Sequence, residues 1–294
     1  MNEKTLCIYH GNCADGFGAA WVVREWFKWN RSLDDIEFFA GFYQKPPPDV
    51  ISRDVIIVDF SYPLNVLTEM SVKVKSLLIL DHHKTAAGEL AHLVPPPSSY
   101  DKWQTDVATK TAALFDMNRS GAGLAWDFFF PDLPRPALIS HIEDRDLWRF
   151  KIPCTREIQA ALFSYPYDFV EWSRLMNTDP RSLIEEGVAI ERKHNKDIRE
   201  LLPVVTRKMR IFGHVVPVAN LPYSFSSDAG NILAAAAPFA ACYWDTPAGR
   251  VFSLRSRPDG EDVSAIAAAF GGGGHKNAAG FTVPWDAPHM PEVV

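Results

Sequence analysis

The sequence predicts an α/β fold in two parts. An N-terminal domain built on a parallel sheet is followed by a smaller α/β domain, and a helical linker joins them. Three short apolar runs, at 6–9, 55–58 and 77–80, predict buried strands, because a parallel sheet covered on both faces needs continuous hydrophobicity. The stretches between these runs, 19–29 and 64–74, have the apolar spacing of crossover helices. The 294 residues exceed one typical domain of about 150.

Later segments predict the remaining elements. Ser120 is a candidate N-cap for a helix over 124–130, and another helix is expected over 136–142. A partial apolar stripe among many charges from 183 to 202 predicts a helix that is solvated on one side. We therefore place a linker at 183–204, between domains at 1–182 and 205–294. In the second domain, strands are expected at 209–219, 240–245 and 251–256, and helices at 231–237 and 263–270.

Composition excludes several classes of protein. The 30 basic residues against 36 acidic ones give a net charge of −6, so long duplex nucleic acid is a poor partner, because its affinity comes largely from phosphate neutralisation. The longest apolar run, residues 232–244, is interrupted by Pro238 and is shorter than the roughly 20 residues of a membrane span. Four cysteines without Cys-x-x-Cys spacing, and a polar N-terminus, indicate a reduced cytoplasmic protein. The oligomeric state stays open, a homodimer included.

Polar side chains follow each of the three predicted strands. His10 ends the first, Asp59 the second, and Asp81, His82 and His83 the third. Because the carboxyl ends of parallel strands meet at one edge of the sheet, these groups should converge. Mixed imidazole and carboxylate ligands suit a divalent ion such as Mn²⁺, Fe²⁺ or Co²⁺. There are enough ligands for two ions, the arrangement that serves displacement at phosphorus. For one such residue alone, a turn-forming aspartate is an equally good interpretation.

These motifs resemble those of the DHH phosphoesterases with a C-terminal DHHA1 domain. The resemblance is carried by residues 10–18, the Val58-Asp59 pair, the Asp81-His82-His83 triplet, an acidic cluster at 143–146 and the late Gly-Gly-Gly-Gly-His at 271–275. The motif order is complete and spans both domains. Members of this superfamily include nano-RNases, dinucleotide phosphodiesterases, bisphosphonucleotide phosphatases, exopolyphosphatases, the exonuclease RecJ and type II pyrophosphatases.

The resemblance implies a role for each motif residue. One metal would be bound by His10 and Asp59, and a second by Asp15, Asp59, His82 and Asp144, with Asp59 as the bridge. His83 would contact the scissile phosphate or leaving group, and Asp81 would orient a histidine. Asp146 is the alternative to Asp144. Asp144 is preferred, because Trp148 follows Asp144 by four residues and matches the aromatic residue that follows this aspartate in the family. The predicted metal ligands are His10, Cys13, Asp15, Asp59, His82 and Asp144, and the predicted catalytic residues are His83 and Asp81.

Cys13 is a departure from the family pattern, which usually has an aspartate at this position. Its thiolate would shift the preference toward softer ions. Alternatively, Cys13 is a small buried filler, with His10 or a water supplying the ligand. A third interpretation, a catalytic cysteine, is disfavoured because the metals already supply an activated water.

The second domain has its own candidate residues. A glycine run can direct several backbone N–H groups toward an anion, and an arginine can grip phosphate through two hydrogen bonds. The alternatives are a flexible glycine linker and, for the arginine, the neighbouring Arg257. In the family, the matching arginine and histidine bind substrate phosphate or the terminal nucleoside. The predicted substrate-binding residues are Arg255, Gly272, Gly273, Gly274, His275 and Asn277.

The sequence thus predicts a hydrolase that acts on phosphodiester or phosphomonoester bonds with two divalent ions. Mn²⁺ is preferred, with Co²⁺ or Mg²⁺ as alternatives. Expected substrates are short oligoribonucleotides, linear or cyclic dinucleotides, or bisphosphonucleotides. Two other functions stay open: an exopolyphosphatase or pyrophosphatase-like hydrolase, and a catalytically impaired nucleotide-binding module.

Overall fold

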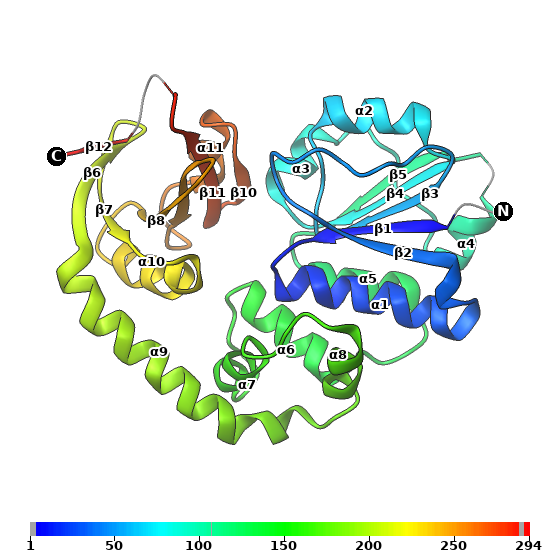
Figure 1. Cartoon of the computed structure of the whole chain (residues 1–294), viewed down its shortest axis with the longest axis horizontal. Helices are drawn as coiled ribbons and strands as arrows, with labels where there is room; N and C mark the ends of the chain where they lie inside the picture. Colours follow the sequence, from blue (N-terminus) through cyan, green and yellow to red (C-terminus); the bar gives the residue numbers. More distant parts are fainter. Residues whose placement is uncertain (1–3, 107, 288–290) are drawn as a thin grey trace. The chain divides into compact units, whose positions relative to one another are not determined.

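The computed structural model describes residues 4–106, 108–287 and 291–294. The chain divides into two compact units, residues 1–191 and 192–294 (Figure 1). The first contains a five-stranded parallel sheet and the second a seven-stranded mixed sheet, so the predicted α/β class is confirmed. None of the described helices is long and apolar enough to cross a membrane.

The sheet of the first unit has the strand order β2-β1-β3-β4-β5, and every neighbouring pair is parallel. The three strands expected from the apolar runs are present, and two further strands were not predicted. Because the order reverses between β1 and β3, the carboxyl ends of these strands flank a crevice where ligands bind in open α/β sheets. The strands are β1 (Thr5–His10), β2 (Ile36–Gly41), β3 (Asp54–Val58), β4 (Ser76–Asp81) and β5 (Thr111–Phe115).

Helices cover both faces of this sheet. Helices α1 and α5 pack on one face and α2 on the other (Figure 1). Each face has its own apolar core, which is why β1, β3 and β4 are hydrophobic without alternation. Ser120 caps α5 by accepting a hydrogen bond from the Gly123 N–H, as predicted. The helices are α1 (Ala14–Asn30), α2 (Leu64–Lys73), α3 (Lys84–Glu89), α4 (Tyr100–Thr105), α5 (Gly121–Phe129), α6 (Ala137–Asp146), α7 (Thr155–Leu162) and α8 (Phe169–Met176).

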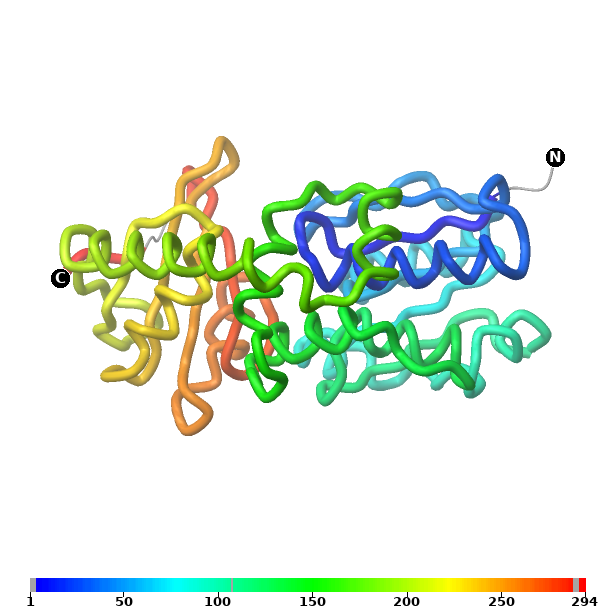
Figure 2. Tube along the Cα trace, turned by 90° about the horizontal axis from the view of Figure 1, so that it is seen from below, coloured from blue at the N-terminus to red at the C-terminus, as the bar shows by residue number. Residues whose placement is uncertain are grey.

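Helix α9 (Ile184–Val205) connects the two units along the chain (Figure 2). It lies where the sequence predicted a helical linker, and Pro203 is inside its last turn. Charged side chains dominate its surface, with i,i+4 ion pairs such as Lys193 with Asp197.

The sheet of the second unit has the order β10-β11-β9-β8-β7-β6-β12, with only β7 and β8 parallel. The single strand predicted at 209–219 is wrong, because Phe212 and Gly213 both have positive φ and turn the chain into a two-residue hairpin. The helix predicted at 231–237 begins earlier, at Ser226. The elements are β6 (Thr206–Ile211), β7 (His214–Asn220), α10 (Ser226–Ala234), β8 (Ala240–Thr246), β9 (Gly249–Arg255), α11 (Val263–Ala269), β10 (Gly273–His275), β11 (Ala278–Pro284) and β12 (Glu292–Val293).

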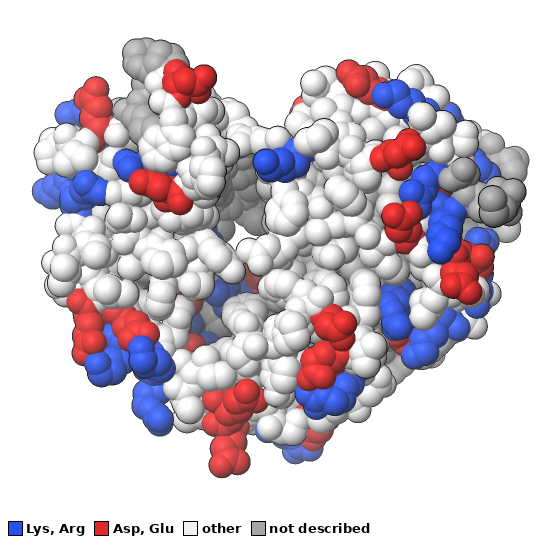
Figure 3. Space-filling model, viewed as in Figure 1, with Lys and Arg blue, Asp and Glu red and all other residues white. Residues whose placement is uncertain are grey.

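Charged side chains of both signs lie on the face of the molecule drawn in Figure 3. On the face drawn in Figure 3, Lys and Arg side chains alternate with Asp and Glu side chains. Short-range ion pairs among exposed side chains include Arg181 with Asp179 and Lys196 with Glu200.

The glycine run is part of a folded hairpin. Gly273 pairs with Gly280 across β10 and β11. A Cβ at Gly272 would lie 2.1 Å from the Gly280 carbonyl oxygen and 2.6 Å from Phe281 Cβ. A side chain therefore cannot be placed at Gly272 without moving the neighbouring strand.

We expect Gly272→Ala to destabilise this hairpin by about 2 kcal/mol. Gly271 is the matched control, since it has a φ of 74° but nothing within 4 Å of a Cβ, and Gly271→Ala should cost only about 1 kcal/mol of backbone strain. Hydrogen exchange of the β10 and β11 amides measures both effects. Equal protection in the two variants would contradict the close approach.

Candidate metal centre

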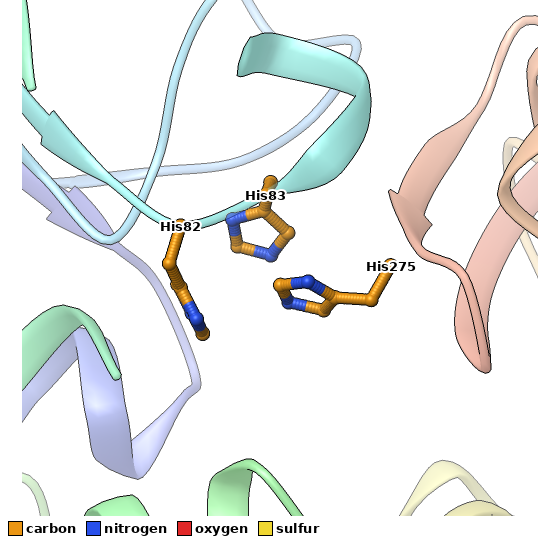
Figure 4. Close-up of side chains that lie close together, drawn as sticks. All are labelled: His82, His83 and His275. Atoms are coloured by element: carbon orange, nitrogen blue, oxygen red, sulfur yellow. The ribbon is translucent and has the colours of Figure 1, made fainter. Parts of the chain in front are cut away.

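The polar residues at the strand ends do converge. His10 is the last residue of β1, Asp59 follows β3, and Asp81 ends β4. His82 and His83 come directly after β4, at the start of α3 (Figure 4). The arrangement follows from the parallel sheet, whose carboxyl edge gathers the residues that end neighbouring strands.

Asp59 lies at the middle of this cluster. One of its carboxylate oxygens is 2.9 Å from His82 Nε2 and the other is 3.4 Å from His10 Nδ1. Its backbone has a φ of 54°, and its N–H donates to the Leu80 carbonyl at 2.9 Å. A non-glycine residue in this conformation is strained. In this conformation the Asp59 carboxylate lies between His10 at the end of β1 and His82 after β4.

Asp15 approaches the cluster from the start of α1. Its two oxygens accept hydrogen bonds from the Gly121 and Ala122 N–H groups at 2.5 and 2.9 Å, so the N-terminus of α5 holds this carboxylate. Gly121 is required there, because a Cβ would lie 2.3 Å from Asp59 Cβ. Asp15 also lies 3.5 Å from His82 Nε2.

Electrostatics within the cluster shift the pKa values in opposite directions. Burial raises the pKa of Asp59, but hydrogen bonds with His10 and His82 outweigh it and hold the pKa well below its usual range. Burial and the charges of Asp59 and Asp146 raise the pKa of Asp15 well above its usual range. Burial lowers the pKa of His82, but the hydrogen bond with Asp59 and the neighbouring carboxylates raise it well above normal. The raised pKa of Asp15 therefore reflects carboxylates that lie close together in this cluster.

Asp81 and His83 form a second pair. Asp81 Oδ1 lies 2.7 Å from His83 Nδ1 and accepts the His82 backbone N–H at 2.8 Å. Burial raises the pKa of Asp81, but the charge and hydrogen bond of His83 lower it overall. The contact orients the imidazole of His83, the arrangement that the resemblance implies for Asp81.

Cys13 lies beside the same cluster. Its sulfur, a ring nitrogen of His10 and an oxygen of Asp59 lie within 4.8 Å of one another. Burial and the nearby carboxylates, Asp59 first, raise the pKa of the thiol well above its usual value. The position is compatible with a metal ligand, and metal coordination would have to stabilise the thiolate.

The structure differs from the sequence interpretation at the acidic cluster of α6. Asp146 has an oxygen 3.7 Å from His82 Nε2 and forms a potential ligand group with Asp15 and His82. Asp144 belongs to none of the ligand groups found among the described residues. Residues two apart on a helix are rotated by about 200° around its axis, so their side chains leave the helix on nearly opposite sides. Only one of the two can therefore face the cluster, and it is Asp146.

Asp144 instead organises the chain after α6. Its carboxylate accepts hydrogen bonds from the N–H groups of Lys151 and Ile152 at 2.8 and 3.0 Å, and from the Thr155 hydroxyl at 2.8 Å. Burial raises the pKa of Asp144, but these three bonds lower it overall. The residue is buried and already occupied by protein donors.

The donor set fits divalent ions. Asp15, Asp59 and Asp81 are at most 2% exposed, and among the described residues their ion pairs are with histidines alone. Asp81 Oδ2 is buried without a hydrogen-bond partner, and Asp59 Oδ2 has only the long 3.4 Å approach of His10 Nδ1. Buried carboxylates need a compensating charge. Two cations held by oxygen, imidazole and thiolate groups would supply it.

The predicted substrate-binding residues lie in the second unit, and several are in use within it. The Arg255 guanidinium donates to the hydroxyls of Ser253 and Ser227 at 3.0 and 2.8 Å. The Asn277 side chain donates to Ser256 Oγ at 2.9 Å, so it supports the turn after β9. Gly273, Gly274 and His275 form strand β10, on which Figure 4 labels His275.

One aromatic residue beside the centre was not predicted. The Tyr43 ring lies 5.4 Å from the His10 ring and 6.1 Å from the His83 ring, centroid to centroid. The sequence signal was the Phe42-Tyr43 pair just before the prolines at 46–48, to which the sequence interpretation assigned no role.

Comparisons with known proteins found both sequence and structure relatives. The uncharacterized protein R106 of Acanthamoeba polyphaga mimivirus is 33% identical over 303 residues, covering 95% of this chain and 67% of that protein. No family model matches the chain.

Solved structures that match include three kinds of protein. The pGpG-specific phosphodiesterase PggH of Vibrio cholerae is 12% identical, with a TM-score of 0.41, over 97% of this chain and 94% of that one. RecJ of Thermus thermophilus with Mn²⁺ is 15% identical, with a TM-score of 0.49, over 96% and 50%. An exopolyphosphatase-related protein of Bacteroides fragilis is 14% identical, with a TM-score of 0.39, over 96% and 87%.

Alanine substitutions of Asp144 and Asp146, the two aspartates of α6, should have different effects on metal binding and on stability. We expect Asp146→Ala to weaken Mn²⁺ binding at least tenfold, since a ligand is lost, with little change in stability. Asp144→Ala removes three hydrogen bonds to a buried carboxylate and should cost about 3 kcal/mol of unfolding free energy. Calorimetric Mn²⁺ titration and urea unfolding of both variants provide the test. Loss of metal affinity in Asp144→Ala alone would reverse the assignment.

Proposed function

We propose that this chain is a metal-dependent hydrolase of phosphate esters. It belongs to the same family as protein R106 of Acanthamoeba polyphaga mimivirus. It also has the ordered motifs of a DHH/DHHA1 phosphoesterase. The observation that carries the proposal is the group of buried carboxylates and histidines at the strand ends, where Asp81 Oδ2 has no hydrogen-bond partner and Asp59 Oδ2 has only a distant histidine. Such a cluster is costly unless it binds cations. Two cations in one site favour chemistry at phosphorus.

The ligands fall into two sets around Asp59. His10, Cys13 and Asp59 would hold one ion, and Asp15, Asp59, His82 and Asp146 the other. When bound, the two ions would activate a water molecule and stabilise the negative charge that develops on the phosphoryl group. Mn²⁺ is the preferred ion, because the donor set is dominated by imidazole and carboxylate groups; Co²⁺ or Mg²⁺ are the alternatives.

The remaining residues would position the substrate. The Asp81 carboxylate accepts the Nδ1 proton of His83, which leaves Nε2 to contact an oxygen of the scissile phosphate or leaving group. Asp15 is fixed by two backbone N–H groups of α5, so its orientation does not depend on the ion. A site prepared in this way loses little free energy to reorganisation during the reaction.

The substrates would be short nucleotides: oligoribonucleotides of a few residues, linear or cyclic dinucleotides, or bisphosphonucleotides. In the second unit, Arg255, His275 and the glycine hairpin would bind the terminal phosphate or nucleoside, because a guanidinium and backbone N–H groups suit an anion. The net charge of −6 and the mixture of charges in Figure 3 argue against binding along a polynucleotide backbone.

Activity should depend on divalent metal and on Asp59. We expect Asp59→Ala to lower kcat/KM at least 100-fold, because both ions lose a ligand. Asp54→Ala is the matched control: Asp54 begins the strand that Asp59 follows, and it pairs with Lys75 near the surface. Rates with Mn²⁺, and metal content by mass spectrometry, measure the effect. Activity that survives exhaustive chelation would refute the metal centre.

Cleavage should also depend on substrate length. Per 5′ or 3′ end, we expect the highest efficiency for about two to five nucleotides, since further phosphates would meet a surface of mixed charge in a chain of net charge −6, without compensating contacts. Initial rates from a dinucleotide to about a 25-mer, at fixed end concentration and low salt, measure this dependence. Rates that stay flat or rise with length would indicate a processive nuclease, and a preference for polyphosphate in the same assay would favour the alternative hydrolase.

A further inference from the structure

The loop after β2 places an aromatic side chain at the candidate metal centre. Tyr43 contacts the rings of His10 and His83 edge-on and the ring of Phe60 at a tilt, with centroids 5.4, 6.1 and 5.0 Å apart. His10 is a proposed metal ligand and His83 a proposed substrate contact. Tyr43 therefore lies beside both a proposed metal ligand and a proposed substrate contact.

The backbone holds Tyr43 in a defined place. The Lys45 N–H donates to the Phe42 carbonyl at 3.2 Å, which closes a β-turn with Tyr43 and Gln44 at its centre. Gln44 has a φ of 64°, a conformation that a turn of this kind demands at its third residue and that glycine normally provides. A left-handed glutamine indicates that the turn is fixed by its surroundings.

The turn is also packed against the first motif. The Gly11 N–H donates to the Gly41 carbonyl at 2.8 Å, and a Cβ on Gly11 would lie 2.5 Å from the Phe42 ring. Phe42 thus fills the space that glycine leaves beside His10. This contact anchors the turn from which Tyr43 projects.

Tyr43 is nevertheless accessible. Its side chain is 49% exposed, although it is surrounded by aromatic neighbours, and the structure records only ring contacts for it among the described residues. Half-exposed aromatic rings beside a phosphate-binding site are typical stacking surfaces for bases, because every base offers a π face.

We propose that the Tyr43 ring stacks against a nucleobase adjacent to the scissile phosphate. The inference rests on the proposed phosphoesterase function and narrows its substrate class to compounds that contain a base. Inorganic polyphosphate and pyrophosphate have no group to stack, so they would gain nothing from Tyr43.

The test compares a substrate with bases to one without them. The probes are 5′-phosphorylated diadenylate and the corresponding dinucleotide with tetrahydrofuran abasic sites, which has the same phosphates. We expect Tyr43→Leu to lower kcat/KM for diadenylate about tenfold, the usual effect of losing one stacking contact, with most of the change in KM. The abasic substrate should change less than twofold.

Two further variants separate stacking from other roles. Tyr43→Phe keeps the ring without the hydroxyl and should retain nearly all activity toward diadenylate. Trp29→Leu is the matched control, because Trp29 is a 58% exposed aromatic of the same unit near the end of α1, roughly 20 Å along the helix from Asp15. Mn²⁺ binding should be unchanged in all three variants.

The outcomes separate the two hypotheses. An equal loss on both substrates in Tyr43→Leu, or a loss in Tyr43→Phe as large as in Tyr43→Leu, would overturn the stacking role and leave the metal-dependent hydrolysis intact. No metal-dependent hydrolysis of either substrate by the unmodified protein would overturn the proposed function and the stacking role with it.

Discussion

Three carboxylates buried at one edge of a parallel sheet are the constraint on which the first unit depends. Asp15, Asp59 and Asp81 are almost inaccessible to water, and an unpaired buried charge costs several kcal/mol. The protein compensates each of them differently. Asp59 lies between two histidines, Asp81 holds a third, and Asp15 is bound by the start of α5. The charge that remains is what a divalent ion would neutralise.

The backbone around the cluster is arranged to permit this burial. Asp59 adopts a left-handed conformation, and Gly121 allows α5 to approach its side chain closely. The conformation of Asp59 would be unfavourable in an ordinary strand-to-helix connection, since a positive φ at a non-glycine residue costs on the order of 1–3 kcal/mol. The strain is supported by the packing of two apolar cores, one on each face of the sheet. Fold stability and site geometry are thus linked through a few residues.

Much of the first unit's fold and of its candidate site could be predicted from the sequence. Continuous apolar runs indicate buried strands, and the polar residues at the ends of those strands indicate the site. The edge strands β2 and β5 could not be predicted, since their burial is only partial and their residues do not form continuous buried runs. The choice between Asp144 and Asp146 depends on which side of one helical turn faces the cluster. The importance of Tyr43 depends on a turn that has an unusual glutamine at its third position. Neither relation is visible in residue spacing alone.

The location of charge also bears on how an acidic chain could bind the proposed substrate, a phosphate ester. At physiological salt the Debye length is about 8 Å, so most of the surface carboxylates that give the net charge of −6 are screened from the centre. Ions held by buried ligands would create a positive potential in a region of low dielectric, where each charge acts more strongly than in water. This attraction is short-ranged and does not distinguish one phosphate from another. Discrimination between phosphate esters therefore needs further contacts besides the ions, and Tyr43 is an accessible aromatic group close to the proposed ligands.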